Sequence, residues 1–432
     1  MFKIFANAIR VEDIRKKLLF IFLLLLIFRF GSAVPLPGVD LQILDFARGT
    51  GGEGFAQTLF TMIAGGGFGS LFAMGIAPYI TASIIMQLLS YAIPYFSELK
   101  KEGEDGNKKI QQYTRWLSVG LAALQAAATV FSYTNIQHLN GANLFREGHQ
   151  NIFVYFVATL AMMSGTIFIM WLAELITEKG IGQGASFLIF ANILAALPMG
   201  ANQLLFMITG REGSPIIGVG LVVLLLAIFV LMIAFVVKVH EGERRIPVQN
   251  AKNAQARSRG ATPQNYLPIK VNIAGVLSII FAMSLLQFPQ QISQFIPGET
   301  WLDTVARFLD WNHWVGATIY VILIFMFTHF YTSFAVNPRE MAENMKKNGG
   351  FIPGIRPGAP TSEFIQTIVN RLSWIGATFY ALIAITPIIL DRFLPIPMGF
   401  GGTSLLIVTG VALEFIKQLE SQLLMRHYKG FL

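Results

Sequence analysis

The chain has 432 residues, of which 54% are hydrophobic and only 13% are charged. The charged fraction is about half of the ~25% that is usual in soluble proteins, and it is too low for the surface of a water-soluble fold of this size. The composition therefore predicts a membrane protein. The sequence has no cysteine, which excludes disulfides, thiol catalysis and cysteine-ligated metal sites. We interpret the net charge of +8 by position, because basic residues in membrane proteins report orientation before they report ligands.

Runs without charged residues predict the membrane-spanning helices, because a spanning helix needs about 20 apolar residues. The first run, 18–34, contains only Arg29, near its end, where a long side chain can reach the membrane surface. The second run, 54–97, is long enough for two helices. The further runs cover 116–145, 148–173, 180–210, 213–237, 271–298, 311–338, 372–390 and 393–413.

The distribution of basic residues decides how often the run 54–97 crosses the membrane. If it crosses once, 26 of the 32 Lys and Arg residues fall on one side and 6 on the other. If it crosses twice, the five basic residues of the 98–115 loop move to the wrong side. Because basic residues accumulate on the cytoplasmic side, the split favours one crossing, ten spanning helices and both termini in the cytoplasm. We expect an all-α, multi-pass protein of a prokaryotic inner membrane.

The ten predicted helices divide into two sets of five, residues 1–200 and 215–432. A five-helix unit begins and ends on opposite sides of the membrane, so any structural repeat between the halves is inverted. No residue-level repeat accompanies this topology. The division into two halves leads us to expect a path between them. Two long cytoplasmic loops, 238–270 and 339–371, belong to the second half. The segment before the first helix mixes apolar and basic residues, which is typical of an interfacial amphipathic helix and not of a cleavable signal peptide.

The run 54–97 is longer than one crossing needs, and the stretch 57–73 is left over. This stretch is apolar but rich in glycine, which weakens helices. Non-helical backbone at membrane depth is tolerated only where it is buried in protein or lines an aqueous cavity. Two interpretations stay open: a short segment that enters the membrane partway and sits in a cavity, or an external loop that lies on the membrane surface.

The motifs of common enzyme chemistry are missing from the sequence. It contains no G-x-x-x-x-G-K-[ST], no H-E-x-x-H and no G-x-S-x-G. The glycine-rich run from Gly180 to Ser186 opens a membrane helix without a preceding strand, so we interpret it as a tight turn between helices and not as a dinucleotide loop. Of the six histidines, only His329 lies inside a predicted span, where interhelical packing explains it better than metal binding. We expect a protein that is not an enzyme, without catalytic residues, metal or cofactor.

Uncharged polar residues fall inside three predicted spans. The charged residues in or beside the spans all lie near the span ends, which disfavours an ion-coupled carrier. Gln87, Gln125 and Asn272 lie in the second, third and seventh helices. An interhelical hydrogen bond contributes on average only ~0.6 kcal/mol. If the three residues meet, they form a latch weak enough to open; alternatively, each bonds within its own neighbourhood.

Several strings of the sequence resemble one family in their order and spacing. They are PYITASIIMQLL (Pro78 to Leu89), KKEGEDGNKK (Lys100 to Lys109), GIGQGAS, LPIKVNIAGV (Leu267 to Val276), NPREMAENMKKNGGFIPGIRPG (Asn337 to Gly358) and GGTSLLIV (Gly401 to Val408). Through these strings the chain resembles the bacterial SecY family, the channel subunits of protein translocases, over nearly its whole length. The resemblance implies two five-helix halves around an hourglass pore. Such a channel moves unfolded secretory polypeptides across the membrane and releases membrane-protein helices laterally into lipid.

The resemblance also implies the parts that seal the pore. A ring of mostly branched aliphatic side chains is implied at Ile76, Ile80, Ile189, Ile280, Ser284 and Ile407. Such a constriction blocks ions by dewetting and yields to a polypeptide, although ordinary helix packing also explains any one isoleucine. The leftover stretch before the second helix matches a plug in position, with Met62, Ile63, Gly65, Gly66 and Phe68. It is shorter than the family pattern and lacks a basic residue.

Helices two, three, seven and eight form the implied lateral gate, through which a signal sequence meets lipid. This setting places Gln87, Gln125 and Asn272 at the gate seam and favours the latch. A latch of ~1–2 kcal/mol is smaller than the contribution of several buried apolar side chains at ~1.5–3 kcal/mol each. We therefore expect substrate hydrophobicity to decide whether the gate opens.

The partners implied by the resemblance are SecE-like and SecG-like small membrane subunits, the SecA ATPase, ribosomes, signal peptides and nascent polypeptides. The implied docking surface consists of basic residues in the two cytoplasmic loops: Arg244, Arg245, Lys252, Arg257, Arg259, Arg339, Lys346, Lys347 and Arg356. Ribosomal RNA is polyanionic and binds such residues in a salt-sensitive way. Alternatively, these residues are only orientation signals. That interpretation explains the sign of their charge but does not explain why the loops are long.

Two other classes of function are weighed against the channel. A small-solute permease needs a charged or convergent polar site at the membrane midplane, which the sequence does not contain. An intramembrane enzyme needs catalytic Ser, Asp or His pairs within the spans, where only His329 and isolated hydroxyls are available. In a channel, by contrast, motor partners or the membrane potential provide the direction of transport.

Overall fold

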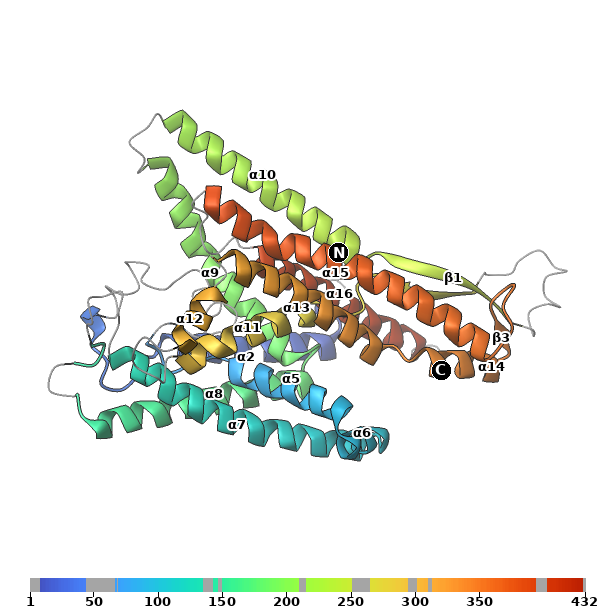
Figure 1. Ribbon diagram of the computed structural model, residues 1–432, viewed down its shortest axis with the longest axis horizontal. Coiled ribbons are helices and arrows are strands. Elements are labelled where there is room, and N and C mark those ends of the chain that lie inside the picture. Colours follow the sequence, from blue (N-terminus) through green and yellow to red (C-terminus); the bar gives the residue numbers. More distant parts are fainter. Residues whose placement is uncertain are drawn as a thin grey trace.

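Figure 1 shows the computed structural model of the chain as a bundle of helices that run along one common direction. The structure describes residues 8–43, 67, 69–134, 143–146, 150–209, 215–250, 265–293, 301–309, 313–393 and 402–429. The short helix α6 (Pro94–Lys101), the strands and α14 (Pro338–Lys347) gather at one end of the bundle. The short helix α12 (Trp301–Phe308) lies at the opposite end.

Long helices account for every predicted span of the described chain. In the first part of the chain they are α2 (Glu12–Ala33), α5 (Ala77–Ala92), α7 (Glu104–Thr134), α8 (Ile152–Lys179) and α9 (Gly184–Thr209). In the second part they are α10 (Pro215–His240), α11 (Leu277–Ser293), α13 (Trp314–Ala335), α15 (Ala359–Phe393) and α16 (Gly402–Lys429). Large apolar side chains such as Phe30 and Leu231 are exposed on these helices, as lipid-facing positions require.

Judged by their described residues, some of these helices are too short or not apolar enough to cross a membrane on their own. Over the described residues, five stretches are long and apolar enough: Glu104–Thr134, Ile152–Lys179, Val219–His240, Trp314–Lys347 and Ala359–Thr386. A sixth is added if α5 and α6, which are bent by 97° at the break between them, form one span. The chain is therefore a multi-pass membrane protein, and the number of ten crossings remains a prediction.

Charge-free runs locate the helices well and their ends poorly. Both α7 and α15 begin well before the predicted starts at 116 and 372. The extra turns carry charged residues that water solvates beyond the membrane, so a rule based on charge-free sequence cannot find them. The predicted helix 271–298 is wrong at its start, because α11 begins at Leu277. Residues 271–276 form a turn, in which Gly275 has a φ of +63°.

The turn between α8 and α9 confirms the interpretation of the glycine-rich run at 180–186. Gly182 has a φ of +92°, a left-handed conformation that glycine adopts without strain. The amide of Gly184 donates to Oγ1 of Thr177 at 2.8 Å, which joins the two helices across the turn. His329 also has the packing role expected of it, since its Nδ1 lies 3.1 Å from Oγ of Ser373 and joins α13 to α15.

The segment in front of α5 is attached to α2 and α8 by its backbone and by one aromatic ring. The amide of Leu71 donates to the carbonyl of Val34 at 2.9 Å. Phe72 is buried, and its ring stacks on Phe28 of α2 at 6.1 Å and on Phe168 of α8 at 6.0 Å. A Cβ at Gly31 would overlap the Phe72 ring, so this glycine makes the close approach possible. The described end of the predicted plug stretch is thus anchored in the helix bundle.

A small sheet unites the two predicted cytoplasmic loops. Strands β1 (Glu243–Asn250), β2 (Asn265–Lys270) and β3 (Gly350–Phe351) pair antiparallel in the order β2-β1-β3. β1 and β2 belong to the first loop and β3 to the second. Ile246 and Ile269 bury their side chains together with Ile352 and with Ile365 of α15. The two loops therefore fold as one unit on the end of α15.

Replacing Phe72 by alanine tests the anchoring of this segment. The change leaves a cavity between Phe28 and Phe168, and we expect it to lower the free energy of unfolding in detergent by about 3 kcal/mol. Phe30→Ala removes the same side chain at a position that is 75% exposed on α2, and serves as the control. Equal thermal stability of the two variants would contradict the anchoring role.

Candidate functional site

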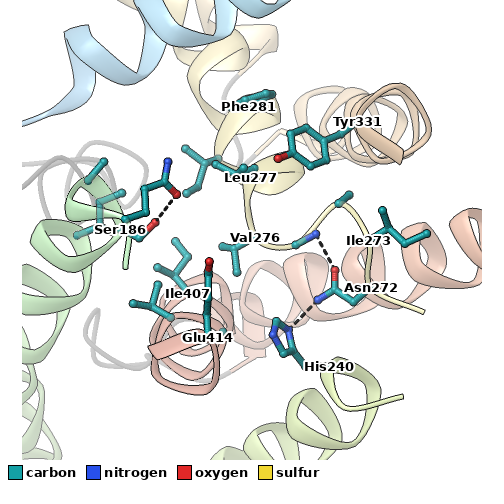
Figure 2. Close-up of a pocket in the computed structure, with 18 of the residues that line it drawn as sticks. Ser186, His240, Asn272, Ile273, Val276, Leu277, Phe281, Tyr331, Ile407 and Glu414 are labelled. Carbon is teal, nitrogen blue, oxygen red and sulfur yellow. Dashed lines mark hydrogen bonds between the residues drawn. The ribbon is translucent and has the colours of Figure 1, made fainter. Parts of the chain in front are cut away.

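One cavity of about 540 Å³ lies between helices of the first and the second part of the chain. Five isoleucines line it, and four of them come from four different helices: Ile80 of α5, Ile189 of α9, Ile280 of α11 and Ile407 of α16. The fifth, Ile273, lies in the turn before α11. Ile407 is labelled in Figure 2, beside Val276 and opposite Ser186. Helices distant in sequence thus bring four of the six predicted ring residues to one space.

The other two predicted ring residues lie beside this cavity and do not line it. Ile76 caps the start of α5, is buried, and belongs to the same hydrophobic cluster as Ile189, Ile280 and Ile407. Ser284 is half-buried one turn further along α11 than Ile280. The predicted plug residues Met62, Ile63, Gly65, Gly66 and Phe68 all lie outside the described residues.

The cavity also has polar and charged lining residues. Gln183 of the α8–α9 turn and Ser186 of α9 contribute, and Ser186 Oγ donates to Gln183 Oε1 at 3.1 Å. The charged lining residues are Lys270, Glu414 and Lys417. The cavity thus combines isoleucines of four helices with polar and charged groups from β2, α9 and α16.

The three polar residues of the predicted latch differ in their surroundings. Gln87 lines the cavity, and its Nε2 donates to Oγ of Ser83 on the same helix at 3.2 Å. Gln125 lies on α7 and is not a lining residue. Asn272 lines the cavity, but the prediction of its location was wrong: it lies in the turn before α11 and not inside a spanning helix. Its side chain contacts His240 and Gly275, as described below.

Helices α5, α7, α11 and α13 meet along one seam of the bundle. α11 packs against α5, α7 and α13. Tyr91 of α5 and Phe330 of α13 form an edge-to-face pair with ring centroids 5.6 Å apart. On the inner side, Phe281 of α11 contacts Phe327 and Tyr331 of α13 in the same edge-to-face geometry. The predicted gate helices are therefore neighbours joined mainly by aromatic contacts in the described chain.

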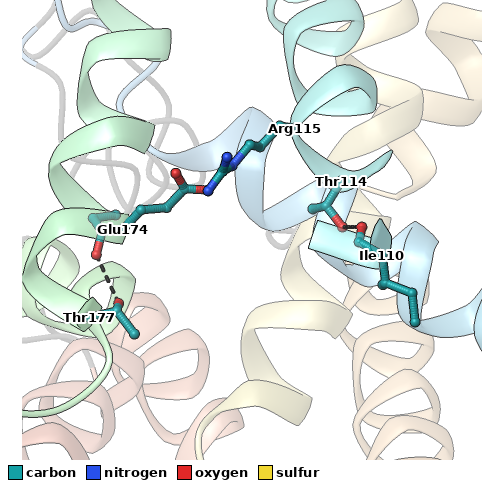
Figure 3. Close-up of polar contacts among 6 residues, drawn as sticks. Ile110, Thr114, Arg115, Glu174 and Thr177 are labelled. Carbon is teal, nitrogen blue, oxygen red and sulfur yellow. Dashed lines mark hydrogen bonds and ion pairs between the residues drawn. The ribbon is translucent and has the colours of Figure 1, made fainter. Parts of the chain in front are cut away.

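An ion pair beside this seam was not predicted. Arg115 Nε of α7 donates to Glu174 Oε1 of α8 at 2.7 Å, and the Glu174 side chain is only 12% exposed. Figure 3 shows the two side chains reaching toward each other from their helices. The partners are far apart in sequence, and each carries a charge near a predicted span end, so sequence alone gives no sign that they meet. The pair fixes α7 against α8 on the outer side of the cavity.

The predicted docking residues that the structure describes are exposed on one end of the molecule. Arg244 and Arg245 lie on β1, and Arg245 pairs with Glu243 at 2.6 Å. Arg339, Lys346 and Lys347 lie on α14, and Arg356 precedes α15. Lys252, Arg257 and Arg259 lie outside the described residues. Because the sheet joins both loops, these residues share one rigid unit.

Comparison with known proteins agrees with this geometry. A sequence model of the SecY family matches residues 70–416. The "Protein translocase subunit SecY" of Halalkalibacterium halodurans is 42% identical over 445 residues, with the whole of both chains covered.

Two solved structures have the same fold. One is described as "The structure of a protein conducting channel", with a TM-score of 0.62 and 18% identity, covering 93% of this chain and 90% of that chain. The other is Sec61 in the canine ribosome-channel complex from the endoplasmic reticulum, with a TM-score of 0.61, 18% identity and the same coverage. The match of the family model and the full-length identity of the bacterial relative show that the chain belongs to the SecY family.

Proposed function

We propose that this chain is the protein-conducting channel of a translocase in a bacterial inner membrane, with both termini in the cytoplasm. It moves unfolded secretory polypeptides across the membrane and releases membrane-protein helices into lipid. The observation that carries the proposal is the convergence of Ile80, Ile189, Ile280 and Ile407, from four helices, on one cavity that also has polar and charged lining residues. The relatives named as SecY translocase subunits support the same function.

The convergence of isoleucines explains how a channel of this kind stays closed to ions. Water in a narrow passage lined by branched aliphatic side chains makes few hydrogen bonds, so the passage dewets and ions lose their hydration. A polypeptide spreads the side chains apart and fills the space itself. Ile76 and Ser284, at the edges of this cluster, complete the proposed ring, and the stretch 57–73 is the proposed plug.

Residues 1–200 and 215–432 are the proposed halves, which part at the seam of α5, α7, α11 and α13. Gln87, Gln125 and Asn272 remain the proposed latch, with Asn272 at the cytoplasmic end of the seam. The aromatic pairs across the seam, such as Tyr91 with Phe330, are contacts that an apolar signal segment can replace with similar burial. Whether the seam stays closed or a signal segment replaces its contacts then depends on how much apolar area the signal segment buries.

The proposed channel is passive and is not an enzyme, so its direction comes from partners. The exposed basic residues of β1, α14 and the turn before α15 are the proposed docking surface for a SecA-like ATPase and for ribosomes. The related Sec61 channel is described in a complex with a ribosome, which supports this class of partner. SecE-like and SecG-like small subunits are the proposed partners of the lipid-facing helices.

A small-solute permease is the second candidate, and it predicts a different cavity. Its site needs convergent polar groups at the membrane midplane, whereas isoleucines of four helices converge on this cavity. The two functions are separated by reconstituting the chain with its partner subunits and a motor into sealed vesicles. Entry of a signal-bearing precursor supports the channel, and failure of entry with all partners present contradicts it.

Polar substitution of the ring tests the seal. We expect the double variant Ile280→Asn/Ile407→Asn to wet the passage and raise the resting sodium chloride conductance of planar bilayers by about tenfold or more. The double variant Ile280→Val/Ile407→Val keeps the passage apolar and serves as the control. The same conductance in both variants would show that these residues do not seal a pore.

Charge reversal at Arg356 tests the docking surface. We expect Arg356→Glu to slow motor-driven import by about tenfold, because a like charge replaces a contact with an acidic partner, and to leave thermal stability unchanged. Lys108→Glu reverses an exposed charge on the same side of the membrane, outside the docking residues. Equal import by the two variants would exclude Arg356 from the docking surface.

Removal of two latch residues tests the gate. The variant Gln87→Leu/Gln125→Leu loses about 1 kcal/mol of polar contacts, so we expect it to accept signal sequences with fewer leucines than the unmodified channel accepts. The measurement is import of one precursor with a graded series of signals. An unchanged hydrophobicity threshold would contradict a latch at these positions.

A further inference from the structure

The turn Val271–Val276 joins the cytoplasmic sheet to the ring helix α11. It begins directly after β2 and ends directly before Leu277, the first residue of α11. Ile280 lies within the first turn of that helix. The amide of Val271 donates to the carbonyl of Gly242 at 2.9 Å, so the turn is also attached to the link between α10 and β1. Any movement of the sheet relative to α11 has to pass through these six residues.

Asn272 holds this turn with both ends of its side-chain amide. Its Oδ1 accepts from the amide of Gly275 at 2.7 Å, and its Nδ2 lies 2.8 Å from Nδ1 of His240, the last residue of α10. Figure 2 shows the side chain between the imidazole ring and the turn. Since a backbone N–H can only donate, the oxygen must face Gly275 and the nitrogen must face the ring. His240 Nδ1 therefore accepts and carries no proton.

Two glycines let neighbouring helices close on the same turn. At Gly376 of α15 a Cβ would lie 3.0 Å from the carbonyl oxygen of Val271. At Gly410 of α16 a Cβ would lie 2.6 Å from Cγ2 of Val276, which is too close for any other residue without a shift. Asn272 is only 6% exposed. The turn is thus enclosed by α10, α15 and α16, all of the second part of the chain.

We propose that Asn272 is a positioning residue that pins the start of α11 to His240 and so holds Ile280 in the closed ring. The inference rests on the proposed channel function and assigns Asn272 a role besides the latch. With the pin in place, α11 keeps its cytoplasmic end fixed while its seam side contacts α5 and α7. Without the pin, the turn keeps its chain connection to β2, but α11 no longer has a fixed start, and Ile280 leaves its place.

Removing either partner of the pin tests this role. We expect His240→Leu to raise the resting sodium chloride conductance of the reconstituted channel by about fivefold, the effect of one lost hydrogen bond. Asn272→Leu removes the bond to Gly275 as well and should raise the conductance at least as much. Because both changes remove the bond between Asn272 and His240, the double variant should conduct no more than Asn272→Leu alone. His329→Leu, which removes the similar contact to Ser373 between α13 and α15, is the control and should not raise the conductance.

A second variant separates positioning from folding. Asn272→Asp keeps an acceptor for Gly275, but its other oxygen binds the imidazole only when Nδ1 carries a proton. The charged groups around the ring are Lys270 of β2 and Lys417 of α16, with Glu414 lining the same cavity. The neutral ring supplies the Nδ1 proton by changing its tautomer, and the imidazolium always carries it. We therefore expect the conductance of Asn272→Asp to lie below that of Asn272→Leu and to fall further toward that of the unmodified channel as the pH is lowered, because the bond to an imidazolium is charge-assisted. Such a rescue by pH is not expected of a misfolded protein.

The outcomes distinguish the pin from the proposed function. Resting conductance of Asn272→Leu equal to that of the unmodified channel, or matched by His329→Leu, overturns the pin. A conductance of Asn272→Asp equal to that of Asn272→Leu at every pH also overturns it. Precursor import by the unmodified channel is measured in the same preparation, and its absence overturns the proposed function instead.

Discussion

Four isoleucine side chains from four separate helices must meet in one place, and this convergence constrains the rest of the bundle. The ring residues lie on α5, α9, α11 and α16, so no single helix can shift without opening the apolar contact that Ile80, Ile189, Ile280 and Ile407 share. Water-excluding contacts of this kind have no directional bonds to correct a misplaced helix. Contacts outside the proposed ring hold the surrounding bundle in place. The Phe72 stack joins the segment before α5 to α2 and α8, the Arg115–Glu174 pair joins α7 to α8, and Asn272 joins the turn before α11 to α10.

Much of the fold was predictable from the sequence, because the membrane forces helices into apolar runs of fixed length. The runs identify each long helix of the described chain, and the glycine-rich turn after α8 follows from its composition. The helix ends were not predictable by the same rule. Charged turns continue α7 and α15 into water, and Gly275 with Asn272 delays the start of α11, although no charge interrupts that run. Hydrophobicity reports where a helix can lie in lipid and does not report where it stops.

The candidate site was predictable only where the family resemblance supplied the residues. Any one isoleucine in an apolar helix is explained by packing, so periodicity alone could not select the four that line the cavity. His240 was missed because it falls in the predicted loop 238–270, just beyond the span 213–237, and the sequence gives no sign of its partner Asn272. The whole of β1 and β2 separates the two residues along the chain. Arg115 and Glu174 were missed for the same reason. Pairing between distant segments is a property of the packed bundle.

The sheet gives the proposed docking surface a mechanical connection to the proposed ring. β3 brings the second of the two predicted cytoplasmic loops to β1, β1 pairs with β2, and β2 continues through the turn at Asn272 into α11. Ile246, Ile269 and Ile352 pack against Ile365 of α15, so the unit resists bending within itself. A force on the exposed arginines of β1 or the lysines of α14 then acts on the unit as a whole. In the described chain, the turn before α11 is the one direct chain connection from the sheet to a helix that carries both a proposed ring residue and a seam contact. If the chain has the proposed function, breaking the bond between Asn272 and His240 is the step by which docking at the proposed surface opens the proposed ring.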